Sequence, residues 1–160
     1  MRLPTSLATI VIATSSFTAS SFTASSLGSS SPTARTTTSL TALRDNSRPL
    51  LIFAPKANDL QLKIQLHYLQ ANPSAVTQRD IMAIAIPITG VAPTHITLTS
   101  GDAQSARQRF GIAPEDFLVI LLGKDGGEKI RSNRPVTLEM LTEIIDAMPM
   151  RQDEMKQQKP

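Results

Sequence analysis

Three short segments of the chain are almost wholly apolar. They are Leu50–Ala54, which Pro55 ends, Asp80–Ile86, which Pro87 ends, and Phe117–Leu122. Apolar runs of this length, with no polar residue at alternate positions, are typical of strands that are buried on both faces. We therefore predict three buried strands.

The segment between Asn58 and Pro73 gives two conflicting signals. Apolar residues alternate with polar ones, which is the period of a strand: Leu60, Leu62, Ile64, Leu66 and Tyr68. The residue types are helix formers, however, and the pair Asn58-Asp59 is typical of a helix N-cap. We predict a helix and keep the strand as the alternative.

Two further helices are predicted from their caps. Ser100 and Asp102 open a short helix that ends at Gly111, because glycine commonly terminates helices. Thr137 caps a last helix, which Pro149 ends or kinks. Four apolar residues of that helix share one face: Leu138, Leu141, Ile145 and Met148.

The remaining elements complete a recognisable order. Lys124-Asp-Gly-Gly127 predicts a hairpin turn, because Asp-Gly favours the positive φ angles of a tight turn, and residues 128–131 form the returning strand. In the long connection 87–100, Ile96 and Leu98 could add a short strand. The order β-α-β-α-β-β-α predicts an α/β, thioredoxin-like fold, a four-stranded mixed sheet with helices on both faces.

The N-terminal part has a different composition. Of residues 1–44, 21 are Ser or Thr, and Ser-Phe-Thr-Ala-Ser occurs twice in succession. We predict a signal peptide over 1–26, a disordered Ser/Thr-rich linker over 27–47, the domain over 48–155 and a disordered tail over 156–160. The product would be periplasmic or secreted; an organelle transit peptide and a spuriously extended start are the alternatives.

The charge and the composition exclude several classes of function. The formal net charge is +3, but residues 1–44 hold three basic residues and no acidic one, so residues 45–160 are neutral. Nucleic-acid binding is therefore disfavoured, and no later apolar run approaches the roughly 18–20 residues of a membrane span. The chain has no Cys, which excludes dithiol exchange, thiol peroxidase chemistry and thiolate metal sites.

Two stretches carry a resemblance to a known family. They are Arg48-Pro-Leu-Leu-Ile-Phe-Ala-Pro55, and the region 110–151 with its motifs Gly-Lys-Asp-Gly-Gly and Met-Pro-Met-Arg. Over residues 48–155 the chain resembles an uncharacterised thioredoxin-like domain of bacterial secreted proteins, also found in animal extracellular sushi-repeat and equarin-type proteins. The resemblance implies the fold and an extracytoplasmic setting, but it brings no catalytic residues.

The predicted topology gathers several loops at one edge of the sheet, where thioredoxins hold their redox Cys pair. Our candidate ligand-binding residues at this edge are Pro55, Lys56, Pro114, Arg131 and Arg134. Three cations near helix N-termini could hold a carboxylate or phosphate. The alternative is that they are solvated charges paired with Asp59 or Glu139. Pro114 loosely resembles the cis-proline of thioredoxins, although we expect its peptide bond to be trans.

Other residue types point to structure more than to chemistry. His67 and His95 lie beside apolar residues and lack partners at metal-ligand spacing, so we predict no metal site. We expect a solvated helix face for Glu139, Glu143 and Asp146, and an apolar patch in place of a Cu(I) site for the methionines of 140–155.

These observations favour a binding module over an enzyme. We expect an exported, non-redox thioredoxin-like domain that binds an unknown protein or a small anion without a cofactor. The alternative is a thiol-independent enzyme, peroxide- or anion-handling, that uses the same sheet edge with Lys56 and Arg131 as electrostatic groups.

Overall fold

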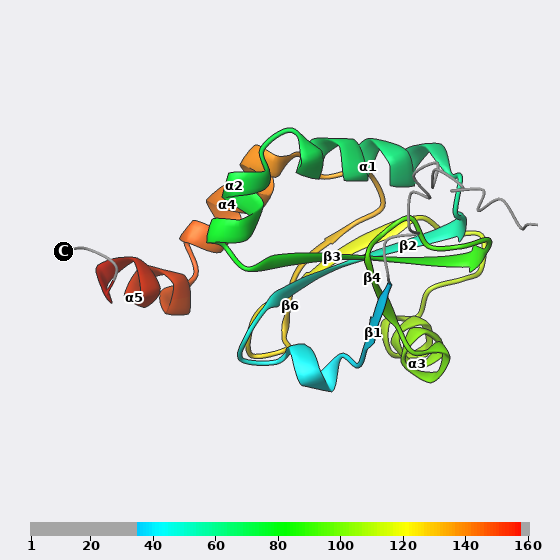
Figure 1. Cartoon of the computed structure of the whole chain (residues 1–160), viewed down its shortest axis with the longest axis horizontal. Helices are drawn as coiled ribbons and strands as arrows, with labels where there is room; N and C mark the ends of the chain where they lie inside the picture. Colours follow the sequence, from blue (N-terminus) through cyan, green and yellow to red (C-terminus); the bar gives the residue numbers. More distant parts are fainter. Residues whose placement is uncertain (1–34, 158–160) are drawn as a thin grey trace, which may run out of the picture. The chain divides into compact units, whose positions relative to one another are not determined.

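A four-stranded mixed sheet organises the domain (Figure 1). The computed structural model describes residues 35–157. The strand order is β3-β2-β5-β6; β2 runs parallel to β3 and antiparallel to β5, and β6 runs antiparallel to β5. The bounds are β2 (Arg48–Lys56), β3 (Ile81–Thr89), β5 (Leu118–Leu122) and β6 (Glu128–Ser132). The predicted fold class is confirmed. Two predicted strand ends are wrong: β3 passes Pro87, because an edge strand tolerates proline, and β2 passes Pro55, which lies beyond the pairing of β2 with β5 that ends at Phe53.

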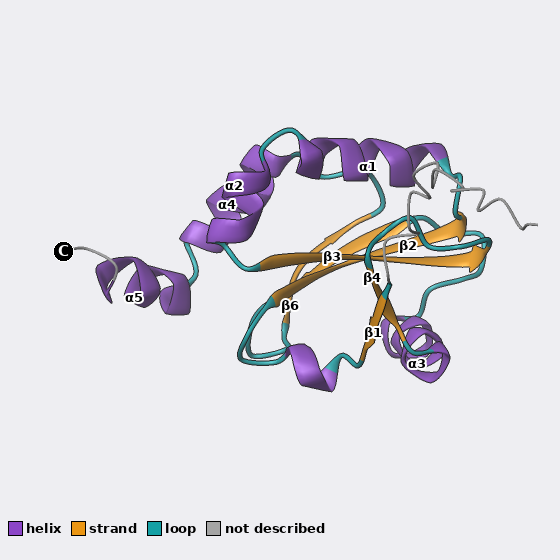
Figure 2. Cartoon of the chain, viewed as in Figure 1, coloured by secondary structure: helices purple, strands orange, loops and turns teal. Residues whose placement is uncertain are grey.

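Helices cover both faces of the sheet, as Figure 2 shows. Alternate residues of β2 point to opposite sides: Leu50, Ile52 and Ala54 belong to one core, Leu51 and Phe53 to the other. The first core packs against α1 (Leu60–Gln70), α2 (Pro73–Gln78) and α4 (Leu138–Asp146). The second packs against α3 (Ser100–Phe110), η1 (Thr41–Leu43) and β4 (Ile96–Leu98). The doubly covered sheet explains why its strands are apolar throughout.

The segment with conflicting signals forms the helix α1. Asp59 is its N-cap and accepts hydrogen bonds from the backbone N–H groups of Gln61 (2.8 Å) and Leu62 (3.2 Å). Leu62 and Leu69 are buried at helical spacing, whereas Leu60 is 70% exposed. The alternating pattern is therefore incidental, and helix propensity with a strong cap decides the outcome.

The other predicted caps and turns are also observed. Thr137 caps α4, and α3 ends at Gly111 in the left-handed conformation, at φ 63°. Thr99, one residue earlier than expected, caps α3. Gly126 supplies φ 74° in the hairpin turn. Pro149 begins a separate helix, α5 (Pro149–Gln157), as its first residue.

The folded part begins before residue 48, which corrects the predicted linker of 27–47. Residues Thr36–Thr38 form β1, which pairs in parallel with β4 in a small second sheet. Leu43 of η1 is 6% exposed and belongs to the second core. This stretch is ordered despite its polar composition because its three threonines are β-branched, which favours a strand, and because Leu43 is buried in the second core. The predicted signal peptide lies outside the described residues, and helix α5 takes up residues 156 and 157 of the predicted tail.

The described part of the chain offers no helix that is both long and apolar enough to span a membrane.

Candidate functional site

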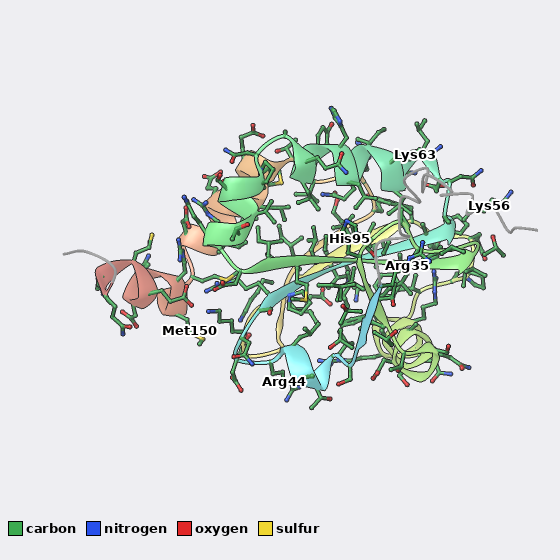
Figure 3. The ribbon with its side chains drawn as sticks, in the orientation of Figure 1. Arg35, Arg44, Lys56, Lys63, His95 and Met150 are labelled. Atoms are coloured by element: carbon green, nitrogen blue, oxygen red, sulfur yellow. The ribbon has the colours of Figure 1, made fainter. Side chains whose placement is uncertain are left out.

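The edge at which β2 and β3 end is the predicted binding edge. Pro55 is half-buried and Lys56 is exposed there, just before α1 begins. Figure 3 places Lys56 and Lys63 at this end of the domain. Strand alternation puts Lys56 on the side of Leu50 and Ile52, the side that α1 and α4 cover.

Arg131 lies on the opposite face of the sheet. It pairs with Ile120 of the second core, and its guanidinium stands 5.9 Å from the centre of the Phe110 ring. Its Nε and Nη2 donate to the carboxylate of Glu128 at 3.0 and 3.1 Å, and its Nη1 donates to the Phe110 carbonyl at 3.1 Å. The hydrogen bond with Arg131 lowers the pKa of Glu128 and raises that of Arg131. The structure therefore does not bring Arg131 beside Lys56, and a carboxylate already balances its charge.

Arg134 and Pro114 occupy loops at this edge. The side chain of Arg134 is exposed, and its carbonyl accepts a hydrogen bond from the Ser132 hydroxyl at 2.8 Å. The peptide bond before Pro114 is trans, as expected, because the described residues contain no cis bond. The loop of Pro114 is closed by a hydrogen bond from the Ala113 N–H to Asp116 Oδ2 at 3.3 Å.

Arg107, on α3, is the residue of this edge that sequence reasoning missed. Its Nη2 donates to the carbonyls of Ala54 (3.0 Å) and Ile86 (2.7 Å), and its Nη1 donates to that of Ala113 (3.4 Å). The guanidinium also lies 5.3 Å from the centre of the Phe53 ring. Burial lowers the pKa of Arg107. A single cation thus joins the ends of β2 and β3 to the loop before β5.

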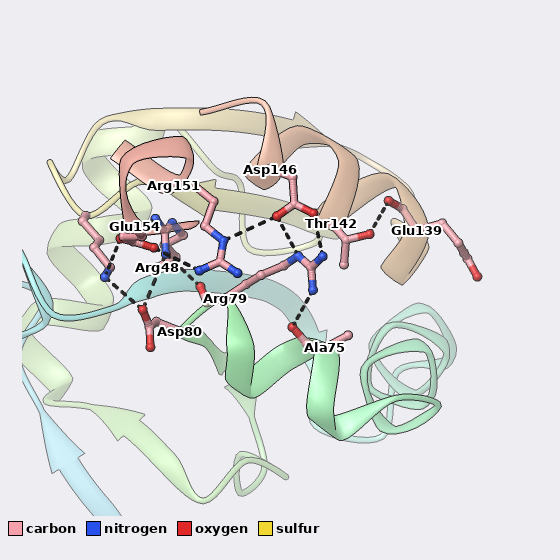
Figure 4. Close-up of polar contacts among 10 residues, drawn as sticks. Arg48, Ala75, Arg79, Asp80, Glu139, Thr142, Asp146, Arg151 and Glu154 are labelled. Carbon is pink, nitrogen blue, oxygen red and sulfur yellow. Dashed lines mark hydrogen bonds and ion pairs between the residues drawn. The ribbon is translucent and has the colours of Figure 1, made fainter. Parts of the chain in front are cut away.

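A second cluster of charged residues lies at the opposite edge of the sheet, where β2 and β3 begin (Figure 4). Arg48, the first residue of β2, is 1% exposed; it donates to Glu154 of α5 at 3.0 Å and to the Arg79 carbonyl at 3.0 Å. Asp80 lies 3.6 Å from Arg48. Lys124 of the hairpin turn reaches Asp80 at 2.9 Å and Glu154 at 2.8 Å. The start of β2, the hairpin and α5 are therefore joined by charge.

The same network continues along α4. Arg79 contacts Asp146 through two hydrogen bonds of 3.0 and 2.6 Å, and Arg151 lies 3.5 Å from Asp146 and 3.2 Å from Glu154. Asp146 is thus an ion-pair partner and not part of the predicted solvated face. The hydrogen bond from Arg79 lowers the pKa of Asp146, although burial alone would raise it.

Glu154 and Lys124 link α5 to the hairpin turn, and in both the effect of hydrogen bonding on the pKa outweighs the opposite effect of burial. Burial alone would raise the pKa of Glu154, but hydrogen bonds from Lys124, Arg48 and Arg151 lower it to about 2. Burial alone would lower the pKa of Lys124, but hydrogen bonds to Glu154 and Asp80 raise it. Both groups are therefore charged at neutral pH.

The motifs that carried the family resemblance meet in this network. Arg48 opens the first stretch, Lys124 belongs to Gly-Lys-Asp-Gly-Gly, and Arg151 ends Met-Pro-Met-Arg. The sequence marked these segments but could not show that they are neighbours in space. Among residues 35–157, no group of His, Asp and Glu side chains is arranged to hold a metal ion.

Comparisons with known proteins agree with this architecture. A family model described as "Domain of unknown function (DUF4174)" matches residues 39–154. Among solved structures, the chain is similar to thioredoxin peroxidase I of Plasmodium yoelii, with 13% identity, a TM-score of 0.52 and coverage of 71% of this chain and 79% of that one. It is also similar to the reduced 2-Cys peroxiredoxin of Plasmodium vivax, with 14% identity, a TM-score of 0.52 and coverage of 71% and 84%.

At these identities the similarity concerns the fold alone, and it confirms the predicted thioredoxin-like architecture. No curated protein matches the chain.

Proposed function

The chain belongs to this family of domains of unknown function, and we propose that it is an exported binding module that works without thiol chemistry. Its ligand is an anionic group, a carboxylate or phosphate, carried by a protein or a small molecule. The binding surface is the edge at which β2 and β3 end, with Pro55, Lys56 and Pro114 at its centre. Arg134 stands at its rim, and Arg131 contributes little because Glu128 balances its charge.

The observation that carries the proposal is the state of Arg107. All three of its hydrogen bonds within the described residues are accepted by backbone carbonyls, which orient the guanidinium without neutralising it. A desolvated cation without a carboxylate attracts anions more strongly than a solvated one. Exposed Lys56 and Lys63 add positive charge at the same end of the domain (Figure 3), on the side of the sheet opposite to the Phe53 ring that Arg107 contacts.

Export is supported by the N-terminal sequence and by the resemblance to secreted and extracellular domains. The basic start, the apolar stretch and the small residues that follow have the layout of a secretory signal. Mass spectrometry of the mature N-terminus from the native host tests this part. Cleavage near residue 26 is expected, and an intact Met1 would contradict export.

The binding edge is tested by site-specific photo-crosslinking in the native host. A photoreactive residue replaces Asn58, which is exposed beside Lys56, or Lys156, which is 75% exposed on α5. We expect a discrete adduct from position 58 and none from position 156. Introducing Lys56→Glu should abolish the adduct from position 58, because it reverses the charge that attracts the ligand.

An adduct that is unchanged by Lys56→Glu, or that forms equally from position 156, would contradict the proposed edge. A screen for hydrolase and peroxidase activity tests the alternative function. Activity above background that depends on Lys56 would favour the thiol-independent enzyme.

A further inference from the structure

A hollow of about 200 Å³ lies beside the charged network, at the edge opposite the proposed binding edge. Its lining combines the cations Arg48, Lys124 and Lys129 and the carboxylate of Asp125 with the apolar side chains of Met148 and Met150. We propose that this hollow, here called the Arg48 hollow, binds a small amphiphilic anion that consists of a carboxylate head and a short apolar chain. The inference is independent of the function proposed above, because it concerns another edge and other residues.

Positive charge exceeds negative charge around the Arg48 hollow. The network of Figure 4 holds the cations of Arg48, Arg79, Lys124 and Arg151 against three carboxylates, those of Asp80, Asp146 and Glu154. The pair of Lys129 and Asp125 adds one charge of each sign. Each of these cations contacts at least one carboxylate, but together the groups carry one net positive charge, which an anion would balance.

Hydrogen-bond donors also remain unused. The Nε of Arg48 is buried and has no hydrogen-bond partner within the described residues. Lys124 contacts two carboxylates through Nζ, which carries three protons, and Lys129 contacts one. A buried donor without an acceptor is costly, and the remaining protons of Lys124 and Lys129 can give a carboxylate in the hollow charge-assisted hydrogen bonds.

The rest of the lining fits an apolar chain. Met148 is half-buried against the first core, and Met150 is 50% exposed. Methionine side chains adapt to the shape of an apolar ligand. A cavity of about 150 Å³ accepts benzene, so the Arg48 hollow has room for a carboxylate with a chain of about five carbons. The surrounding cations oppose Cu(I), which the methionine motif alone could have suggested.

The test is isothermal titration of the purified full chain with hexanoate at neutral pH and low salt. Acetate supplies the head without the chain, and hexan-1-ol supplies the chain without the charge. We expect hexanoate to bind at least about tenfold more tightly than either, because each buried methylene contributes about fourfold and a charge-assisted hydrogen bond about tenfold or more.

Met150→Asp places a negative charge at the rim and should weaken hexanoate binding by at least about tenfold. Met140→Asp is the matched control, because Met140 is 52% exposed on α4 and does not line the hollow. Lys129→Gln, with Lys156→Gln as its control, should weaken binding by a few fold and serves if Met150→Asp does not fold.

Each unfavourable result overturns a stated part of the proposal. Equal binding of hexan-1-ol would show an apolar hollow without anion recognition, and equal binding of acetate would show a simple cation cluster. Absence of hexanoate binding, or equal losses in the Met150 and Met140 variants, would overturn the assignment to this hollow.

Discussion

Replacing Glu154 with glutamine is the sharpest test of the charged network. Glu154→Gln keeps the size of the side chain but removes the charge that faces Arg48, Lys124 and Arg151. Arg48 is 1% exposed; besides its hydrogen bond to the Arg79 carbonyl, it would keep one carboxylate contact, the longer one of 3.6 Å with Asp80. We expect the free energy of unfolding to fall because a buried guanidinium loses its nearest carboxylate.

The magnitude follows from the pKa of Glu154. A fall of that pKa from 4.5 to about 2 corresponds to at most about 3 kcal/mol of stabilisation at neutral pH. Removing one partner of a buried ion pair costs about 3–5 kcal/mol. The Glu154 side chain is 23% exposed, so solvent screens part of the interaction. We therefore expect Glu154→Gln to lower the free energy of unfolding by about 2 kcal/mol.

The stabilisation by Glu154 should depend on pH. The pKa of Glu154 is lower in the folded chain than in the unfolded one. Its stabilisation is therefore complete above about pH 5 and is lost as the pH falls towards 2. The difference in unfolding free energy between the wild type and Glu154→Gln should be constant from pH 5 to 7 and should vanish near pH 2.

Urea unfolding followed by circular dichroism, at several pH values between 2 and 7, measures this difference. Glu143→Gln is the control, because Glu143 is exposed on α4, and it should change stability by less than about 0.5 kcal/mol. A Glu154→Gln effect that is as small as that of the control, or that is equal at pH 2 and 7, would refute the reasoning.

Three further substitutions test other contacts by the same unfolding assay. Gln65→Leu should destabilise by about 2–4 kcal/mol, because the fully buried Gln65 bonds both the N–H (2.7 Å) and the carbonyl (3.0 Å) of Val136; a neutral effect would contradict this. Arg107→Met should cost about 1–3 kcal/mol by leaving the strand-end carbonyls unpaired, and a more stable variant would show that the bonds are dispensable. Leu62→Ser should destabilise by about 2–4 kcal/mol while Leu60→Ser stays within about 0.5 kcal/mol; equal effects would contradict the orientation of α1.

Local signals predicted most of the fold. The three apolar runs became β2, β3 and β5, and the caps at Asp59 and Thr137 began the expected helices. Each of these signals depends on residues that are close together in the sequence, so it can be recognised without knowing the three-dimensional fold. Residues 36–43 were missed because their composition is polar, and only their pairing with β4 and their packing order them.

The sites were less predictable because their contacts join distant residues. Arg107 meets a carbonyl 53 positions earlier, and Arg48 meets a carboxylate 106 positions later. Topology correctly gathers loops at one edge but does not decide which side of the sheet a residue faces. Arg131 was therefore grouped with Lys56, although strand alternation places the two on opposite faces.

The contact between Arg48 and Glu154 bears on the order in which the chain can fold during synthesis. The strand that begins at Arg48 is made long before α5 emerges. Until then Arg48 has the Arg79 carbonyl and Asp80 as partners but not Glu154, so its burial is less favourable than in the complete chain. A nascent chain that ends before residue 154 therefore packs its central strand with less stability, by about 2 kcal/mol, than the complete chain does.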